Sequence, residues 1–194
     1  MAKIVAVNGS PFSSGNTAWL LNELGKEIEK NGVSFEILPL NEALSKLKLP
    51  YCVCCSPKCN RSCYKGTEFE ELFEKCVEAD GIIFGSPVYF GSMSAQLKCF
   101  FDKTRDLRAK KAFVGKVASA VSVGATKYGG QQSTLRAIQD CLMVLGFTIV
   151  GDADEELGCG HFGLSAQRPA CEDDYAISRI PVLAKRMCEE VKKR

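Results

Sequence analysis

Short apolar runs alternate with amphipathic segments along the chain, and this alternation limits the fold more than any other feature. Each apolar run has the length and composition of a buried strand, and the runs cover residues 3–7, 34–40, 81–84, 116–123 and 147–150. Segments with apolar residues at helical spacing follow them, at residues 17–31 (with Asn16 as N-cap), 68–77, 94–106, 131–145 and 180–193. Because helical crossovers join parallel strands, this order predicts an α/β fold with a five-stranded parallel sheet covered on both faces.

Composition and charge narrow the class of protein. The 194 residues are 46% hydrophobic and 25% charged, which predicts one globular domain over residues 1–194. Five strand–helix units in a chain of this length fit a flavodoxin-like, doubly wound sheet. Lys and Arg number 25 against 23 Asp and Glu. This near balance leaves no strong electrostatic field over the whole protein that would attract nucleic acid or anionic lipid. No apolar run approaches the roughly 20 residues of a membrane helix, and no secretory signal precedes the first strand. We therefore expect a cytoplasmic protein without membrane or nucleic-acid partners.

The segment at about 41–66, after the second strand, is the part that departs from the plain alternation. Connections of about 2–6 residues are usual, and much longer ones tend to be functional. Five of the eleven cysteines lie within residues 52–63 of this segment. Four thiolates on one short loop can hold an iron–sulfur cluster, whereas zinc ribbons separate their Cys pairs by about 15–20 residues. The spacing favours a [4Fe–4S] cluster, with zinc and thiol chemistry as alternatives.

Three loops rich in Gly and hydroxyl residues follow the first, third and fourth predicted strands. Residues 9–17 combine Ser and Thr hydroxyls with a helix N-terminus, which suits a phosphate monoester. Residues 86–92 and 124–131 combine Gly with aromatic side chains, which suits the edge and face of a flat heterocycle. Because the carboxyl ends of parallel strands share one sheet edge, the three loops together predict a bound cofactor.

These loops carry a family resemblance. Gly-Ser-Pro…Ser-x-Asn-Thr at 9–17, Gly-Ser-Pro-Val-Tyr-Phe at 85–90 and Tyr-Gly-Gly-Gln at 128–131 resemble the NADPH-dependent FMN reductase family. The resemblance implies an FMN-binding oxidoreductase. It implies cofactor contacts from Ser10, Pro11, Ser14, Gly15, Asn16 and Thr17 to the phosphate, and from Pro87, Val88, Tyr89, Phe90, Gly91, Ser92, Gly124, Thr126, Tyr128, Gly129 and Gly130 to the isoalloxazine.

With the cysteine loop added, the chain resembles the iron–sulfur flavoproteins, a subgroup of that family. The subgroup pattern is C-x2-C-x2-C with a fourth cysteine several residues later. Here Cys52 and Cys55 match its first interval, but three residues precede Cys59 and three more precede Cys63. We therefore expect the metal ligands to be Cys52, Cys55, Cys59 and Cys63, with Cys54 as a surplus candidate.

The function that these features predict is electron transfer between a [4Fe–4S] cluster and FMN, with no catalytic side chain nominated. The resemblance implies ferredoxin or a similar carrier as donor, a small molecule or protein as acceptor, and a homodimer or homotetramer. One alternative is an NAD(P)H-dependent FMN or quinone reductase whose cysteines hold zinc or no metal. Another is a flavin- and metal-binding regulatory module without turnover.

Several other segments are expected to be structural. Cys76, Cys99, Cys141 and Cys188 lie on predicted helices among apolar residues, where cysteine packs as a small hydrophobe. The basic run 105–111 predicts a solvated face, with an acidic ferredoxin as an alternative partner. His161, the one histidine, is expected to be polar surface, and residues 151–175 are expected to be irregular.

Overall fold

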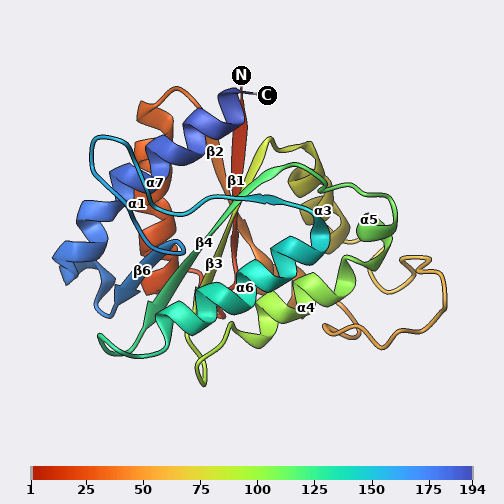
Figure 1. Cartoon of the computed structure of the whole chain (residues 1–194). Coiled ribbons are helices and arrows are strands. Elements are labelled where there is room, and N and C mark those ends of the chain that lie inside the picture. The colour runs from red at the N-terminus through yellow and green to blue at the C-terminus, as the bar shows by residue number, and fades with distance from the viewer. Residues whose placement is uncertain (1, 194) are drawn as a thin grey trace.

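The structure, a computed structural model that describes residues 2–193, has a parallel sheet between two layers of helices (Figure 1). The strands are β1 (Lys3–Asn8), β2 (Ser34–Pro39), β3 (Gly81–Pro87), β4 (Val117–Gly124), β5 (Thr148–Ile149) and β6 (Leu164–Gln167). The helices are α1 (Asn16–Lys30), α2 (Leu40–Ser45), α3 (Glu68–Glu78), α4 (Ala95–Lys103), α5 (Arg105–Ala109), α6 (Gln131–Leu145) and α7 (Asp174–Lys192). The strand order β2-β1-β3-β4-β5, with all pairs parallel, confirms the predicted doubly wound α/β fold.

The sheet has a sixth strand that the sequence analysis missed. The first half of β4 pairs with β5, and its second half, from Val121 to Gly124, pairs in parallel with β6. The fifth strand position is therefore built from two short segments, and the chain leaves the sheet between them. The expectation that 151–175 is irregular was wrong for β6, because four residues with two buried apolar side chains carry too little pattern to predict a strand.

Two apolar cores hold the layers together. Helices α1 and α7 cover one face of the sheet, where Leu24 and Ile28 share a buried cluster with Met187. Helices α3, α4 and α6 cover the other face, where the core is rich in phenylalanine and includes Phe73 and Phe100. All eight residues of β4 are buried, as expected for a central strand of a sheet covered on both faces.

Three predicted helix boundaries differ from the observed ones. The predicted helix 94–106 breaks at Thr104 into α4 and α5. Helix α7 begins at Asp174 rather than at residue 180, because the side chain of Asp173 caps it by accepting a hydrogen bond from the Ala176 amide at 3.0 Å. Asn16 is the first residue of α1 and Gly15 is its N-cap, so the predicted cap at Asn16 was wrong.

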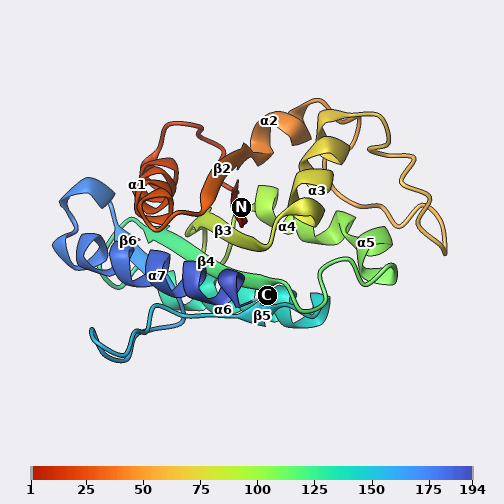
Figure 2. The ribbon, with the colours of Figure 1, turned by 90° about the horizontal axis from the view of Figure 1, so that it is seen from above.

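The long connection after β2 begins with α2 and then runs without regular structure to Thr67, apart from turns. It extends outward beyond α3 and α5 (Figure 2). The five cysteines of the sequence cluster lie on this extension. A search of residues 2–193 finds no helix with the length and apolarity needed to cross a membrane.

Candidate functional site

The three cofactor loops lie together at the carboxyl edge of the sheet. Strands β1, β3 and β4 are in register there, with Asn8 opposite Gly85 and Pro87 opposite Val123. The hydroxyl of Ser94 donates to the Gly9 carbonyl at 2.6 Å, which joins the first loop to the start of α4. The hydroxyl of Ser133 donates to the Gly91 carbonyl at 2.7 Å, which joins the second loop to α6. The structure thus brings together the predicted loops.

The first loop presents an open helix N-terminus. Gly15 caps α1 without a side-chain hydrogen bond, and the first turn contains no acidic residue, so the first amide groups are free of a competing anion. Within the loop, Ser10 Oγ accepts from the Phe12 amide at 3.1 Å, and both Ser10 and Thr17 are buried. Helix amides and hydroxyls of this kind bind phosphate, so the loop fits the predicted phosphate group.

Asn16 links this loop to a segment far along the chain. Its side-chain oxygen accepts a hydrogen bond from the Ala170 amide at 2.8 Å. This contact explains why the residue does not cap its own helix, since the oxygen is already engaged. It also orients the side-chain NH2 group as a donor near the start of α1.

The second and third loops expose aromatic rings. Phe90 is fully exposed in a left-handed backbone conformation (φ 50°), and Tyr128 is 91% exposed. Gly130 also has a positive φ of 96°, and a Cβ there would lie 3.0 Å from the Gly91 Cα. Close backbone approach beside exposed rings is suited to a flat heterocycle. These loops fit the isoalloxazine predicted for them.

The cysteine loop carries its thiols near one another in sequence but not in a closed metal site. Cys54 and Cys55 are exposed, whereas Cys52, Cys59 and Cys63 are half-buried. Within residues 2–193, no three or more His, Cys, Asp or Glu side chains form a group that could hold a metal ion. Convergence of the four expected ligands therefore stays a prediction.

Two cations of helices α4 and α5 contact this loop. The guanidinium of Arg105 donates to the carbonyls of Ser56 and Pro57 at 3.0 and 3.1 Å. The ammonium of Lys103 lies 3.5 Å from the Cys63 Sγ, and the Lys103 side chain is buried. The expectation that 105–111 is only a solvated face was wrong for Arg105, because its partners come from a loop nearly fifty residues earlier in the chain.

Tyr64 follows Cys63 and is buried beneath the loop. Its ring packs against Phe69 and Phe73, with centroid distances of 5.6 and 5.3 Å. Within the described residues its hydroxyl has no hydrogen-bond partner, and burial raises its pKa above the ordinary value. Buried hydroxyls are nearly always paired, so this one fits an acceptor that is supplied by a bound group. The donor set and this orphaned hydroxyl fit an iron–sulfur cluster.

The remaining helical cysteines pack as predicted. Cys76 and Cys188 are buried in the two cores, and burial raises the pKa of the Cys188 thiol to about 11. Cys99 and Cys141 are half-buried against the phenylalanine-rich core, and burial raises the pKa of each thiol. Raised pKa values disfavour the reactive thiolate, which agrees with a packing role.

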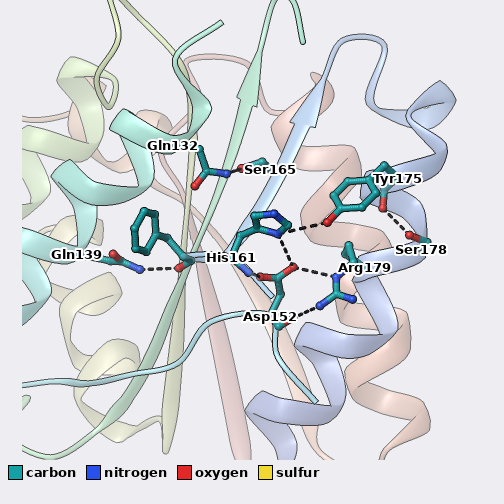
Figure 3. Close-up of polar contacts among 9 residues, drawn as sticks. Gln132, Gln139, Asp152, His161, Ser165, Tyr175, Ser178 and Arg179 are labelled. Carbon is teal, nitrogen blue, oxygen red and sulfur yellow. Dashed lines mark hydrogen bonds and ion pairs between the residues drawn. The ribbon is translucent and has the colours of Figure 1, made fainter. Parts of the chain in front are cut away.

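A second polar cluster, missed by the sequence analysis, lies beside the third loop (Figure 3). Asp152 is 1% exposed, and one of its carboxylate oxygens lies 3.0 Å from the Arg179 Nε. The other oxygen accepts from the His161 amide, and His161 Nδ1 lies 3.3 Å from the Tyr175 hydroxyl. With Tyr128 and neighbours, these residues line a cavity of about 760 Å³. No local pattern marks this cluster, because its members come from three separate segments.

A parallel sheet with an open helix N-terminus and two aromatic loops at its carboxyl edge is typical of a flavodoxin-like flavin protein. A model of the family described as NADPH-dependent FMN reductase matches residues 2–156. The chain belongs to this family, which makes it an FMN-dependent oxidoreductase. It is also 35% identical to an iron-sulfur flavoprotein of Methanocaldococcus jannaschii, over 98% of this chain and 97% of that protein.

Two further similarities extend the comparison. The chain is 44% identical to an NAD(P)H dehydrogenase (quinone) of Trichlorobacter lovleyi, but over only 55% of this chain and 60% of that protein. A flavodoxin, WrbA-like protein from Agrobacterium tumefaciens shares the fold with a TM-score of 0.70 at 17% identity, covering 100% of this chain and 99% of that chain. The structural similarity shows the flavodoxin-like fold alone, and the similarity to the NAD(P)H dehydrogenase agrees with the oxidoreductase class.

Proposed function

We propose that the protein holds FMN at the carboxyl edge of the sheet and a [4Fe–4S] cluster on the cysteine loop, and passes electrons between them. The observation that carries the proposal is the cluster of five cysteines on a loop added to an FMN-binding fold. The similarity to an iron-sulfur flavoprotein along nearly the whole chain supports it. FMN accepts one or two electrons and a cluster accepts one, so the pair supplies conversion between one- and two-electron carriers.

The chain's own residues bind and orient the two groups. The amides at the start of α1, with Ser10 and Thr17, hold the phosphate, and the loops at Val88 and Tyr128 hold the ring. Cys52, Cys55, Cys59 and Cys63 supply the thiolates, and Arg105 holds the loop backbone against α5. Reaction then needs positioning and tuned potentials rather than a side chain acting as acid or base.

The partners that we propose are a ferredoxin or similar carrier as donor and a small molecule or protein as acceptor. Arg108, Lys110 and Lys111 are exposed near the cysteine loop and suit an acidic carrier. We also propose a homodimer or homotetramer. Phe12, Phe90 and Tyr128 expose aromatic rings around the cofactor edge, and exposed apolar groups of this kind are commonly covered in assemblies.

A second candidate function is an NAD(P)H-dependent FMN or quinone reductase with zinc or no metal. The cavity beside Tyr128 supports it, since about 760 Å³ next to the ring loop offers room for a second substrate. The similarity to a quinone dehydrogenase over about half of the chain also supports it.

The test of the proposed function is an absorption spectrum of anaerobically purified protein, with iron, zinc and acid-labile sulfide measured on the same sample. Flavin bands with about four irons and four sulfides per chain are expected. The Cys54→Ser variant should keep this content, whereas Cys59→Ser should lose iron. Flavin with zinc or without metal, together with rapid flavin bleaching by NADPH, contradicts the proposal and favours the second candidate.

A further inference from the structure

A buried cation and a buried hydroxyl meet the cysteine loop at one point. Lys103 is 2% exposed, and within residues 2–193 the one hydrogen bond of its side chain is to the Cys63 Sγ at 3.5 Å. Its ammonium also lies 6.0 Å from the centre of the Phe69 ring. Tyr64, equally buried, packs its ring against the same phenylalanine, and its unpaired hydroxyl lies within electrostatic range of Cys59 and Cys63. Both donors thus lie beneath the end of the loop that contains Cys59 and Cys63.

Within residues 2–193 the Tyr64 hydroxyl has no hydrogen-bond acceptor, although the Asp106 carboxylate lies in its electrostatic surroundings, and Lys103 has only a thiol. An ammonium taken out of water without an anionic partner is strongly unfavourable, and a neutral thiol is a weak acceptor. A buried hydroxyl without a partner is unfavourable for the same reason. Cys63 belongs to the surroundings of both donors, so one acceptor with negative charge at the Cys59–Cys63 side of the loop would satisfy both.

The surroundings hold both donors in place. Tyr64 is fixed by its two ring contacts and by its carbonyl, which accepts from the Thr67 hydroxyl at 2.6 Å. Arg61, three residues earlier, pairs with Glu70 at 2.9 Å and anchors this end of the loop to α3. Lys103 ends α4, whose Phe100 and Phe101 lie in the core. The side chains at this end of the loop are therefore held in place by the protein itself, whereas Cys54 and Cys55 lie exposed at the other end.

We propose that Tyr64 Oη and Lys103 Nζ donate to the Cys59–Cys63 side of an anionic iron–sulfur cluster, and that this contact raises its reduction potential. The inference rests on the proposed function, because it needs a cluster on this loop. Reduction adds one electron, and therefore one negative charge, to the cluster. Fixed donors and a nearby cation stabilise the reduced form more than the oxidised form. Lys103 and Tyr64 are positioning residues in this scheme, since the thiolates bind the iron.

Loss of the ammonium or the hydroxyl should affect the protein with a bound cluster and the protein without one differently. If Lys103 and Tyr64 only supported the fold, removing the ammonium or the hydroxyl would destabilise both forms. If they serve the cluster, both groups are unsatisfied in the cluster-free protein. Lys103→Met and Tyr64→Phe should then leave the cluster-free form equally stable or more stable, while the loaded form changes its potential.

The experiment compares these two variants with wild type and with Lys98→Met. Lys98 is an exposed lysine of the same helix, paired with Asp102, and serves as a matched control for loss of one charge. The cluster potential is measured by anaerobic redox titration, iron and sulfide are assayed, and the cluster-free forms are unfolded in urea. Lys103→Met should shift the cluster's one-electron equilibrium about tenfold toward the oxidised form. This corresponds to a reduction potential about 59 mV lower than that of wild type. Tyr64→Phe should shift it in the same direction, and Lys98→Met by less than threefold.

Three results would contradict either the inference on Lys103 and Tyr64 or the proposed function. Potentials that stay within threefold of wild type in both loaded variants overturn the inference and leave the proposed function standing. A cluster-free Lys103→Met protein that is clearly less stable than wild type also overturns it, because Lys103 is then structural. Wild type that holds neither iron nor sulfide after anaerobic purification overturns the proposed function and the role of both donors with it. Loss of iron from Lys103→Met, with cluster-free stability kept, supports the inference.

Discussion

A carboxylate at the start of α1 should repel the FMN phosphate and weaken FMN binding while leaving the fold intact. Gly15 caps this helix with extended backbone angles (φ −82°, ψ −173°), a conformation that Asp and Asn both adopt as N-caps. A Cβ there would lie 3.3 Å from the Cβ of Phe12, whose side chain is exposed. Gly15→Asp therefore places a negative charge where the structure leaves the amide groups open.

The size of the effect follows from charge and distance. Two unit charges about 4 Å apart repel by about 1 kcal/mol in water and about 4 kcal/mol near a protein surface. At this half-exposed position about 2 kcal/mol is expected, which weakens FMN binding about 30-fold. Gly15→Asn has the same shape and capping ability without the charge, so it should weaken binding less than about fivefold.

Fluorescence titration of cofactor-free protein with FMN measures both affinities, and urea unfolding measures both stabilities. Neither variant should lose stability, and Gly15→Asp should gain up to about 1 kcal/mol from the helix dipole. FMN affinity close to that of wild type in both variants would refute the assignment of the phosphate to this helix. A large, equal loss in both variants would instead mean that the side chain, rather than the charge, blocks the site.

Three further predictions follow from the contacts described above. Asp152→Ala should cost about 3 kcal/mol in urea unfolding, because the partly buried Arg179 loses its carboxylate partner and keeps only the main-chain carbonyl of residue 152. A loss below about 1 kcal/mol, typical of exposed pairs, would contradict this. Hydrogen bonds from Lys75 and Lys3 lower the pKa of Glu36 below its ordinary value of 4.5. The stabilisation from these contacts is therefore complete at neutral pH and is lost as the pH falls from 4.5 through the lowered pKa. Glu36→Gln should remove a small part of the acid dependence of stability, and an unchanged pH profile argues against the pairing. Cys54→Ser should keep the iron content of wild type, and loss of iron on anaerobic assay would make Cys54 a ligand.

Much of the candidate site was predictable because its signals are local. The Gly- and Ser-containing loops follow recognisable strands, and parallel strands end at one edge, so residues 10–17, 87–92 and 124–130 had to lie together. The spacing of the cysteines is likewise visible in twelve consecutive residues. Boundaries were predicted less well where a tertiary contact competed, as at Asn16, whose side chain bonds to Ala170 instead of capping α1.

The α/β alternation, the three loops at the sheet edge and the cysteine cluster can be read from the sequence, because hydrophobic period and turn chemistry act over a few residues. Tertiary structure alone decided which distant side chains meet. It placed β6 beside β4, Arg179 beside Asp152, and Lys103 beside Cys63, each across a long stretch of chain. Such contacts depend on how the helices pack over the sheet, and no local pattern carries that information.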